Sequence, residues 1–257
     1  MRSSPFAALD ARLAPAPEPR RIAFFSYVSD FAHRGLWGPG APENSLAAAA
    51  AAIAQGHGIE CDVRLSRDGT PHVIHDADAE RLCGDPRRID HMGDVEIAAL
   101  RLSGTDERIP TLAGLLALIA GRAALLIEIK TDTRAHAAIC LAVRRAIEGY
   151  RGPAAVMGFN PEVSRWFGVH APRVPRGLVM SEDRDRPIRD AVRRRLAVWR
   201  ARPDFLAYDV RYLASALPAA LHRKGLPLVT WTVRTEADRR CAANCDAIPT
   251  FERAPAR

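Results

Sequence analysis

Residues 59–76 read IECDVRLSRDGTPHVIHD, two apolar runs separated by a short polar stretch that contains Asp68-Gly69. An Asp-Gly pair between two such runs is a strong β-hairpin signal, and residues 66–71 are too few to form the crossover that joins parallel strands. We therefore expect an antiparallel hairpin here. If Asp68 and Gly69 form a two-residue turn, His75 lies directly opposite Asp62, with the two side chains on one face.

On both sides of this hairpin, short apolar runs alternate with segments of helical periodicity, which is typical of a parallel sheet or barrel. Strands are expected at 31–35, 59–65, 72–75, 125–129, 155–159, 177–180, 205–209, 228–233 and 246–250. Helices are expected at 44–55, 112–120, 135–148, 161–167, 188–199, 216–224 and 236–243. With 72–75 set aside, eight runs remain, and a length of about 225 residues suits an eight-stranded barrel. The predicted fold is an α/β (β/α)8 TIM barrel with a β-hairpin excursion after the second strand.

The 257 residues are expected to comprise an N-terminal extension, 1–28, and a barrel domain, 29–257. The extension carries arginines and prolines without the apolar segment of a signal peptide. The one long irregular connection is 76–110, and such connections tend to border functional sites. No apolar run reaches the ~18 residues that a membrane span needs, so no stable membrane insertion is expected.

Basic residues exceed acidic ones by 37 − 30 = 7, but they are scattered along the chain, so no nucleic-acid partner is expected. Basic residues are densest at 186–195. Their spacing around Ile188, Val192 and Leu196 is more typical of a solvated helix face than of a nucleic-acid-binding patch. The five cysteines show no CxxC motif and no zinc-site spacing. Reduced thiols in a cytoplasmic protein are therefore expected, and the sequence leaves the oligomeric state open.

Charged residues gather where the predicted strands end, which in a barrel is the active mouth. These residues are His33, Arg34, Glu60, Asp62, His75, Glu128 and Lys130. Three carboxylates form a hard oxygen site that suits Ca²⁺ or Mg²⁺. Histidine can take or give a proton at neutral pH, and cations can neutralise charge on a phosphoryl group.

These segments resemble the glycerophosphodiester phosphodiesterase family, in the family's order and spacing over about 220 residues. The segments that carry the resemblance are Ala32-His33-Arg34-Gly35, Pro42-Glu43-Asn44-Ser45, Glu60-Cys61-Asp62-Val63-Arg64-Leu65, Asp68-Gly69, Ile74-His75-Asp76, Ile109-Pro110-Thr111-Leu112, Ile127-Glu128-Ile129-Lys130 and Trp231-Thr232-Val233. The chain departs from the family pattern at Gly158, Arg234 and Phe251-Glu252, which affects the expected shape of the leaving-group pocket.

The resemblance implies an enzyme of lipid and glycerol metabolism that uses one divalent metal, Ca²⁺ or Mg²⁺, to hydrolyse a small-molecule glycerophosphodiester to glycerol 3-phosphate and an alcohol. The matching positions are Glu60, Asp62 and Glu128 as metal ligands, His33 and His75 as acid and base, and Arg34, Lys130, Glu43, Asn44 and Trp231 as substrate-binding residues. Which histidine is the acid stays open, and Trp231 either contacts the substrate or completes the barrel core.

Two alternatives remain. A lysophospholipase D-like or C-like enzyme acting on lysolipids would need an apolar docking surface, for which 22–28 is the candidate segment. A non-catalytic barrel that binds a phosphoryl ligand would be expected to have lost a metal ligand or a histidine, and all seven positions are filled.

Overall fold

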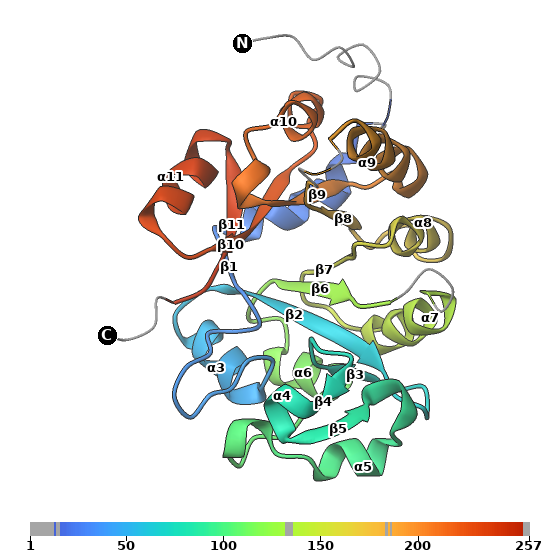
Figure 1. Ribbon diagram of the computed structural model, residues 1–257, viewed down its shortest axis with the longest axis vertical. Coiled ribbons are helices and arrows are strands. Elements are labelled where there is room, and N and C mark those ends of the chain that lie inside the picture. Colours follow the sequence, from blue (N-terminus) through green and yellow to red (C-terminus); the bar gives the residue numbers. More distant parts are fainter. Residues whose placement is uncertain (1–12, 14–15, 132–135, 183–184, 186, 254–257) are drawn as a thin grey trace. The chain divides into compact units, whose positions relative to one another are not determined.

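The computed structural model describes residues 13, 16–131, 136–182, 185 and 187–253 (Figure 1). The chain divides into two compact units. The first unit consists of Phe31–Ala154 together with Glu252 and Arg253, and the second consists of Ala155–Phe251 together with the described residues before Phe31. Of the expected extension 1–28, residues 1–12 and 14–15 lie outside the described residues.

The first unit contains three parallel strands covered by helices. The strands are β1 (Phe31–Ala32), β2 (Gly58–Leu65) and β6 (Leu125–Ile129), with β2 paired to both others. The helices are α3 (Leu46–Ala54), α6 (Leu112–Ile119) and α7 (His136–Ile147). Both β2 and β6 are almost wholly buried, as strands of a parallel sheet covered on both faces are, although β2 carries Glu60 and Asp62. Thr111 is the N-cap of α6, since its side chain accepts a hydrogen bond from the Gly114 backbone.

The hairpin is confirmed, because β3 (Pro71–Val73) pairs antiparallel with β2. Its predicted register is wrong by one residue. The Ser66 N–H donates to Thr70 O, so the turn contains three residues and ends on Gly69 at φ +88°. A three-residue loop with glycine in the left-handed region is the next commonest hairpin connection after the two-residue turn. Ile74, and not His75, therefore faces Asp62 across the ladder.

The connection predicted as irregular at 76–110 consists instead of short elements. These are β4 (Asp78–Ala79), α4 (Glu80–Cys83), β5 (Asp85–Arg88), η2 (Ile89–His91), α5 (Asp94–Ala99) and η3 (Leu102–Gly104). They surround a small core that includes Ile89, Met92 and Leu102. Elements of two to six residues are too short to show a period, so the sequence pattern did not reveal them.

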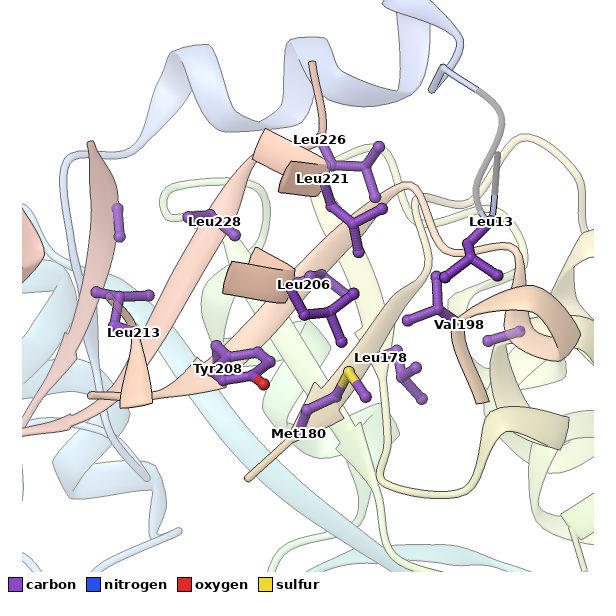
Figure 2. Packing of buried hydrophobic residues seen from close by; sticks show 13 residues of the cluster. Leu13, Leu178, Met180, Val198, Leu206, Tyr208, Leu213, Leu221, Leu226 and Leu228 are labelled. Atoms are coloured by element: carbon purple, nitrogen blue, oxygen red, sulfur yellow. The ribbon is translucent and has the colours of Figure 1, made fainter. Parts of the chain in front are cut away.

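The second unit contains the remaining parallel strands. They are β7 (Ala154–Met157), which starts at the end of the first unit, β8 (Gly177–Met180), β9 (Phe205–Asp209), β10 (Leu228–Val233) and β11 (Ala247–Phe251). Strands β8 to β11 pair in sequence order. The helices are α8 (Pro161–His170), α9 (Pro187–Ala201), α10 (Ala216–His222) and α11 (Glu236–Asn244). Between strands and helices lies a leucine-rich core with Tyr208 and Met180 (Figure 2).

Eight parallel strands thus alternate with helices in the order of a (β/α)8 barrel, as predicted. The strand expected at 31–35 is shorter than predicted, because β1 ends after Ala32. The chain turns there, with Arg34 at φ +59° and Gly35 at φ +79°. A Cβ on Gly35 would lie 2.9 Å from Ala48, so only glycine fits this close approach to α3.

Helix α9 is present, but the solvated basic face predicted for 186–195 is only partly correct, since Arg189 and Arg193 are exposed. Arg194 and Arg195 are buried, whereas Ile188, Val192 and Leu196 are exposed. Arg186 lies outside the described residues. The inversion arises because ion pairs hold the polar side of the helix inward, which helical periodicity alone does not reveal.

The segment considered as a docking surface, 22–28, is only partly packed against the second unit. It belongs to α2 (Pro19–Ile22) and η1 (Ala23–Tyr27). Phe24 is buried, and Phe25 lies edge-on to Phe205 with ring centroids 5.0 Å apart. Tyr27 remains exposed. Among the described residues, no helix is both long and apolar enough to cross a membrane.

Candidate active site

Three buried carboxylates from two adjacent strands lie together in the first unit. Glu60 and Asp62 are two residues apart on β2 and therefore share a face, and Glu128 of β6 is the register partner of Asp62. Each residue contributes one oxygen to a group whose members lie within 4.8 Å of one another. Strand alternation and parallel register thus bring together the three residues that were predicted as metal ligands.

Burial and mutual repulsion shift the protonation of these carboxylates. Burial, reinforced by the negative charge of Asp62, raises the pKa of Glu60 to about 8. Burial also raises the pKa of Glu128. Burial would likewise raise the pKa of Asp62, but the charges of Lys130 and Arg34 outweigh it and lower that pKa. Full ionisation of all three carboxyls would thus place more negative charge at this site than the two adjacent cations balance, and Glu60 and Glu128 bind protons more readily for that reason.

Two cations face this cluster. The Lys130 Nζ atom lies 3.0 Å from Asp62 Oδ1 and also contacts Glu128. The Arg34 Nε atom lies 3.2 Å from Asp62 Oδ2, and its backbone N–H donates to Glu60 Oε2 at 2.9 Å. Burial lowers the pKa of Lys130, but the carboxylates outweigh this effect and raise it. Both predicted phosphate-side cations therefore lie at the carboxylates and remain charged.

Asn44 and Glu43 complete the polar pocket from the segment that leads into α3. Asn44 Nδ2 donates to Asp62 Oδ2 at 3.1 Å, and Asn44 Oδ1 accepts from the Asp62 backbone N–H at 3.2 Å. Glu43 accepts from Arg34 Nη1 at 2.7 Å. Asn44 and Arg34 both have φ near +60°. Such backbone costs ~1–3 kcal/mol per residue and clusters at functional sites.

The His33 ring lies between two carboxylates. Its Nδ1 atom lies 2.6 Å from Glu252 Oε1 and its Nε2 atom 3.9 Å from Glu60 Oε2. The charge of Glu252 favours Nδ1–H as the donor. Burial lowers the pKa of His33, but the hydrogen bond to Glu252 and the charge of Glu60 outweigh it, so that the pKa is raised.

His75 follows β3 and is held differently. Its Nδ1 atom is 2.8 Å from Asp76 Oδ1, and its carbonyl oxygen accepts from Arg64 Nε at 2.7 Å. Although Ile74 takes the position opposite Asp62, His75 remains close enough for the Asp62 charge to act on it. Burial lowers the pKa of His75, and the pKa stays below its ordinary value despite the Asp62 charge.

An ion-pair chain connects the hairpin with the segment after β1. Arg81 of α4 donates from Nε to Asp76 Oδ2 at 2.6 Å and from Nη2 to Glu43 Oε1 at 2.7 Å. Asp76 holds His75, and Glu43 holds Arg34. The connection at 76–110 thus borders the site through Arg81.

The sequence reasoning missed three residues that hold this site in place. Asp76 lies next to His75 in the motif Ile74-His75-Asp76, but no function was predicted for it. No sequence pattern pointed to Arg81. Glu252 was noted only as a departure from the family pattern. It directly follows β11, and the rule that selected the other residues, a charged group where a strand ends, would have found it.

Trp231 lies in the second unit, on β10. Its Nε1 atom donates to Ala207 O at 3.1 Å, and its ring lies edge-on to Phe159 at 5.6 Å between centroids. Both side chains are partly exposed. The other nine predicted site residues lie in the first unit.

The carboxylate cluster fits a divalent cation. Its donors are hard oxygens, and no thiolate or neutral imidazole is needed to complete it. Within the described part of the chain, the buried Glu60 Oε1 atom has no hydrogen-bond partner. An unsatisfied buried carboxylate oxygen costs free energy unless a ligand contacts it. The buried acidic triad is therefore a candidate metal site.

A (β/α)8 barrel with a buried carboxylate triad, two adjacent cations and two carboxylate-bound histidines has the groups that hydrolysis of a phosphodiester needs. The chain belongs to the glycerophosphoryl diester phosphodiesterase family, whose model matches residues 33–250. It is therefore an enzyme of the glycerophosphodiester phosphodiesterase class, a phosphoric diester hydrolase, as the resemblance implied.

Individual relatives agree with this assignment. A glycerophosphodiester phosphodiesterase from Caldanaerobacter subterraneus subsp. tengcongensis is 29% identical over 233 residues, which cover 85% of this chain and 92% of that protein. A solved phosphodiesterase from Oleispira antarctica, in complex with the product sn-glycerol-3-phosphate, has a TM-score of 0.77 at 22% identity and covers 89% of this chain and 94% of its own. A glycerophosphodiester phosphodiesterase from Thermotoga maritima has a TM-score of 0.70 at 25% identity, with coverage of 88% and 94%. The (β/α)8 barrel fold is thereby confirmed.

Proposed function

We propose that this protein hydrolyses small-molecule glycerophosphodiesters to glycerol 3-phosphate and an alcohol at the site in the first unit, with one divalent metal ion, Ca²⁺ or Mg²⁺. The observation that carries the proposal is the buried triad of Glu60, Asp62 and Glu128 with the unpartnered Glu60 Oε1 atom among the described residues. These three residues would hold the metal. When bound, the ion would neutralise charge that develops on the phosphoryl oxygens.

The two histidines are proposed as general acid and general base. Hydrolysis of a diester needs one group to take a proton from the attacking oxygen and another to give a proton to the leaving alkoxide. The Nδ1 atom of each ring contacts a carboxylate, Glu252 for His33 and Asp76 for His75, which leaves Nε2 as the atom for proton transfer. This arrangement supports one proton-transfer group from each of two separate segments.

Arg34 and Lys130 are proposed to bind the non-bridging phosphoryl oxygens. Both are largely buried beside the carboxylates, where low dielectric strengthens their attraction for an anion. Glu43 and Asn44 are proposed to fix the pocket, since Glu43 orients Arg34 and Asn44 orients Asp62. We also propose that Trp231, with Phe159, offers a partly exposed aromatic surface to the substrate.

The substrate class is drawn from the relatives. The Oleispira antarctica structure holds sn-glycerol-3-phosphate, the product expected from this reaction. We propose the same product here, a place in lipid and glycerol metabolism, and no nucleic-acid substrate. The five cysteines are all unpaired, which supports a reducing, cytoplasmic location.

The first test measures release of glycerol 3-phosphate from glycerophosphocholine and glycerophosphoethanolamine with Ca²⁺, Mg²⁺ or EDTA. We expect metal-dependent release in the wild type and its loss in His33→Ala and Glu60→Ala. Glu148→Gln is the matched control, because Glu148 is an exposed acid on the same unit. Release that EDTA does not reduce, or cleavage of a lysolipid but of neither diester, would contradict the proposal.

A second test separates the acid from the base. A diester with a nitrophenolate leaving group needs no protonation of that group, so it should rescue the variant that lacks the acid and not the variant that lacks the base. Comparing His33→Ala with His75→Ala on this substrate assigns the roles. Rescue of both variants would contradict a paired acid and base.

A further inference from the structure

Helix α9 carries an apolar stripe that faces outward. Ile188, Val192, Leu196 and Trp199 recur at intervals of four, four and three residues, so they lie along one side of the helix. Their exposed fractions are 77%, 44%, 59% and 56%. We call these four residues the α9 stripe. Contiguous apolar surfaces of this kind mark interaction sites.

The opposite side of α9 is polar and is held inward. Arg194 Nε donates to Asp190 Oδ2 at 2.7 Å, and Arg194 Nη1 donates to Glu182 Oε1 at 2.9 Å and to the Tyr208 hydroxyl at 2.7 Å. Val198 packs on the same side, in the core of the second unit (Figure 2). Rolling the helix to bury the stripe would break these bonds and expose Val198. The outward position of the stripe is therefore fixed by the fold.

Positive charge lies beside the stripe. Arg189 and Arg193 are each one position after a stripe residue, and both are exposed. The Arg193 side chain is 76% exposed even though it contacts Asp190. A helix with an exposed apolar stripe and arginines along its edge is typical of proteins that lie on a membrane surface.

The stripe ends at a cavity lined by arginines. Helices α8 and α9 lie side by side (Figure 1), and the cavity at their contact has a volume of about 490 Å³. Its lining includes Trp199, Val169, Arg165, Arg176, Arg200 and Arg202. Glu162 pairs with Arg165 and Arg200, and Asp204 pairs with Arg176. Four arginines against two carboxylates leave an excess of positive charge beside the exposed indole.

We propose that the α9 stripe and this cavity dock the protein on the surface of an anionic phospholipid bilayer. The aliphatic side chains would enter the boundary between headgroups and acyl chains, Trp199 would lie at the headgroup level, and the arginines would contact lipid phosphates. A second copy of this chain fits less well, because a twofold contact through the stripe would bring Arg189 and Arg193 near the same arginines of the other copy. Aliphatic side chains also offer nucleic-acid bases little to stack on.

The proposal concerns binding and does not depend on the catalytic roles proposed above. The test is sedimentation of the full chain with vesicles of equimolar phosphatidylglycerol and phosphatidylcholine, and with vesicles of phosphatidylcholine alone. We expect binding to the anionic vesicles only. The double variant Leu196→Gln/Trp199→Gln should bind at least about tenfold more weakly because it loses its apolar insertion. Arg193→Gln should bind about fivefold more weakly at low salt, a difference that shrinks as salt screens the charge.

Two variants serve as matched controls. Val95→Gln removes an exposed apolar side chain from α5, and Arg240→Gln removes an exposed arginine from α11. Both should bind like the wild type. Circular dichroism and the thermal midpoint show that each variant is folded. Equal binding to both kinds of vesicle, undiminished binding of the double variant, or a dimer that the double variant abolishes would overturn the proposal.

Discussion

The protein has a polar cluster in each unit, and the two clusters differ in charge balance. In the second unit, the buried Arg194 and the exposed Arg193 face Asp190 and Glu182, two positive charges against two negative ones. In the first unit, three carboxylates face two cations, Arg34 and Lys130.

The difference separates a structural cluster from a binding site. Arg194 satisfies three acceptors within the protein, and nothing further is needed to stabilise it. The three carboxylates, when all are ionised, carry one negative charge more than Arg34 and Lys130 balance, and the Glu60 Oε1 atom has no hydrogen-bond partner in the described chain. Excess charge of one sign at a buried position identifies a place where a ligand of opposite charge completes the structure.

The substitution Glu60→Gln tests the difference between the two clusters with the largest expected effect. We expect kcat to fall about a thousandfold, because a metal ligand is lost. The thermal midpoint of the metal-free protein should stay the same or rise, because burial and the Asp62 charge already raise the pKa of Glu60 to about 8 and make its ionised form costly. Steady-state kinetics and calorimetry after chelation measure the two effects. A lower midpoint without metal would mean that Glu60 is part of the structural frame.

The corresponding substitution in the cluster of the second unit is Arg194→Met. We expect a loss of about 3–5 kcal/mol in the free energy of unfolding, since Asp190 and Glu182 would lose their buried cation. The folded fraction should keep its kcat. Arg193→Gln is the matched control, because the Arg193 side chain is exposed and its contact with Asp190 contributes about 1 kcal/mol or less. Denaturant unfolding and kinetics distinguish the two variants, and a loss of kcat in Arg194→Met would remove the contrast between the clusters.

Much of the carboxylate cluster could be predicted from the sequence because it follows from periodicity. Glu60 and Asp62 are two apart in a strand, and the parallel neighbour places Glu128 beside them. Every expected strand was also found, since buried parallel strands are nearly continuous apolar runs.

What the sequence did not reveal depends on turns and on tertiary contacts. One extra residue in the turn at Gly69 shifted the hairpin register. The outward face of α9 depends on the ion pair of Arg194 with Glu182 and on its hydrogen bond to Tyr208 of β9, and helical periodicity does not reveal either contact. Glu252 meets His33 across 219 positions of sequence, a contact that only the folded chain creates.

His33 and Glu252 form a pair beside the carboxylate cluster of the first unit. The substitution Glu252→Gln tests whether this pair has a role in the reaction. We expect kcat to fall by about 10- to 100-fold with little change in KM, because a neutral amide holds the Nδ1–H of His33 and its orientation less firmly. Glu252→Asp should restore part of the rate, and the ring nitrogen chemical shifts of His33 should report the change in hydrogen bonding. An equal loss in Glu252→Asp and Glu252→Gln, with unchanged ring shifts, would assign Glu252 to structure alone.

The smallest effect is expected for Arg81→Met, which cuts the ion-pair chain between Asp76 and Glu43. The Arg81 side chain is half exposed, so its ion pairs compete with water and with salt. Asp76 keeps its contact with His75, and Glu43 keeps its contact with Arg34, when Arg81 is removed. We therefore expect kcat/KM to fall by only about threefold. A loss of kcat/KM as large as that of Glu252→Gln would show that the hairpin and the segment after β1 act on the substrate together, through Arg81. It would also show that the solvent exposure of an ion pair does not by itself tell whether the pair is essential for activity.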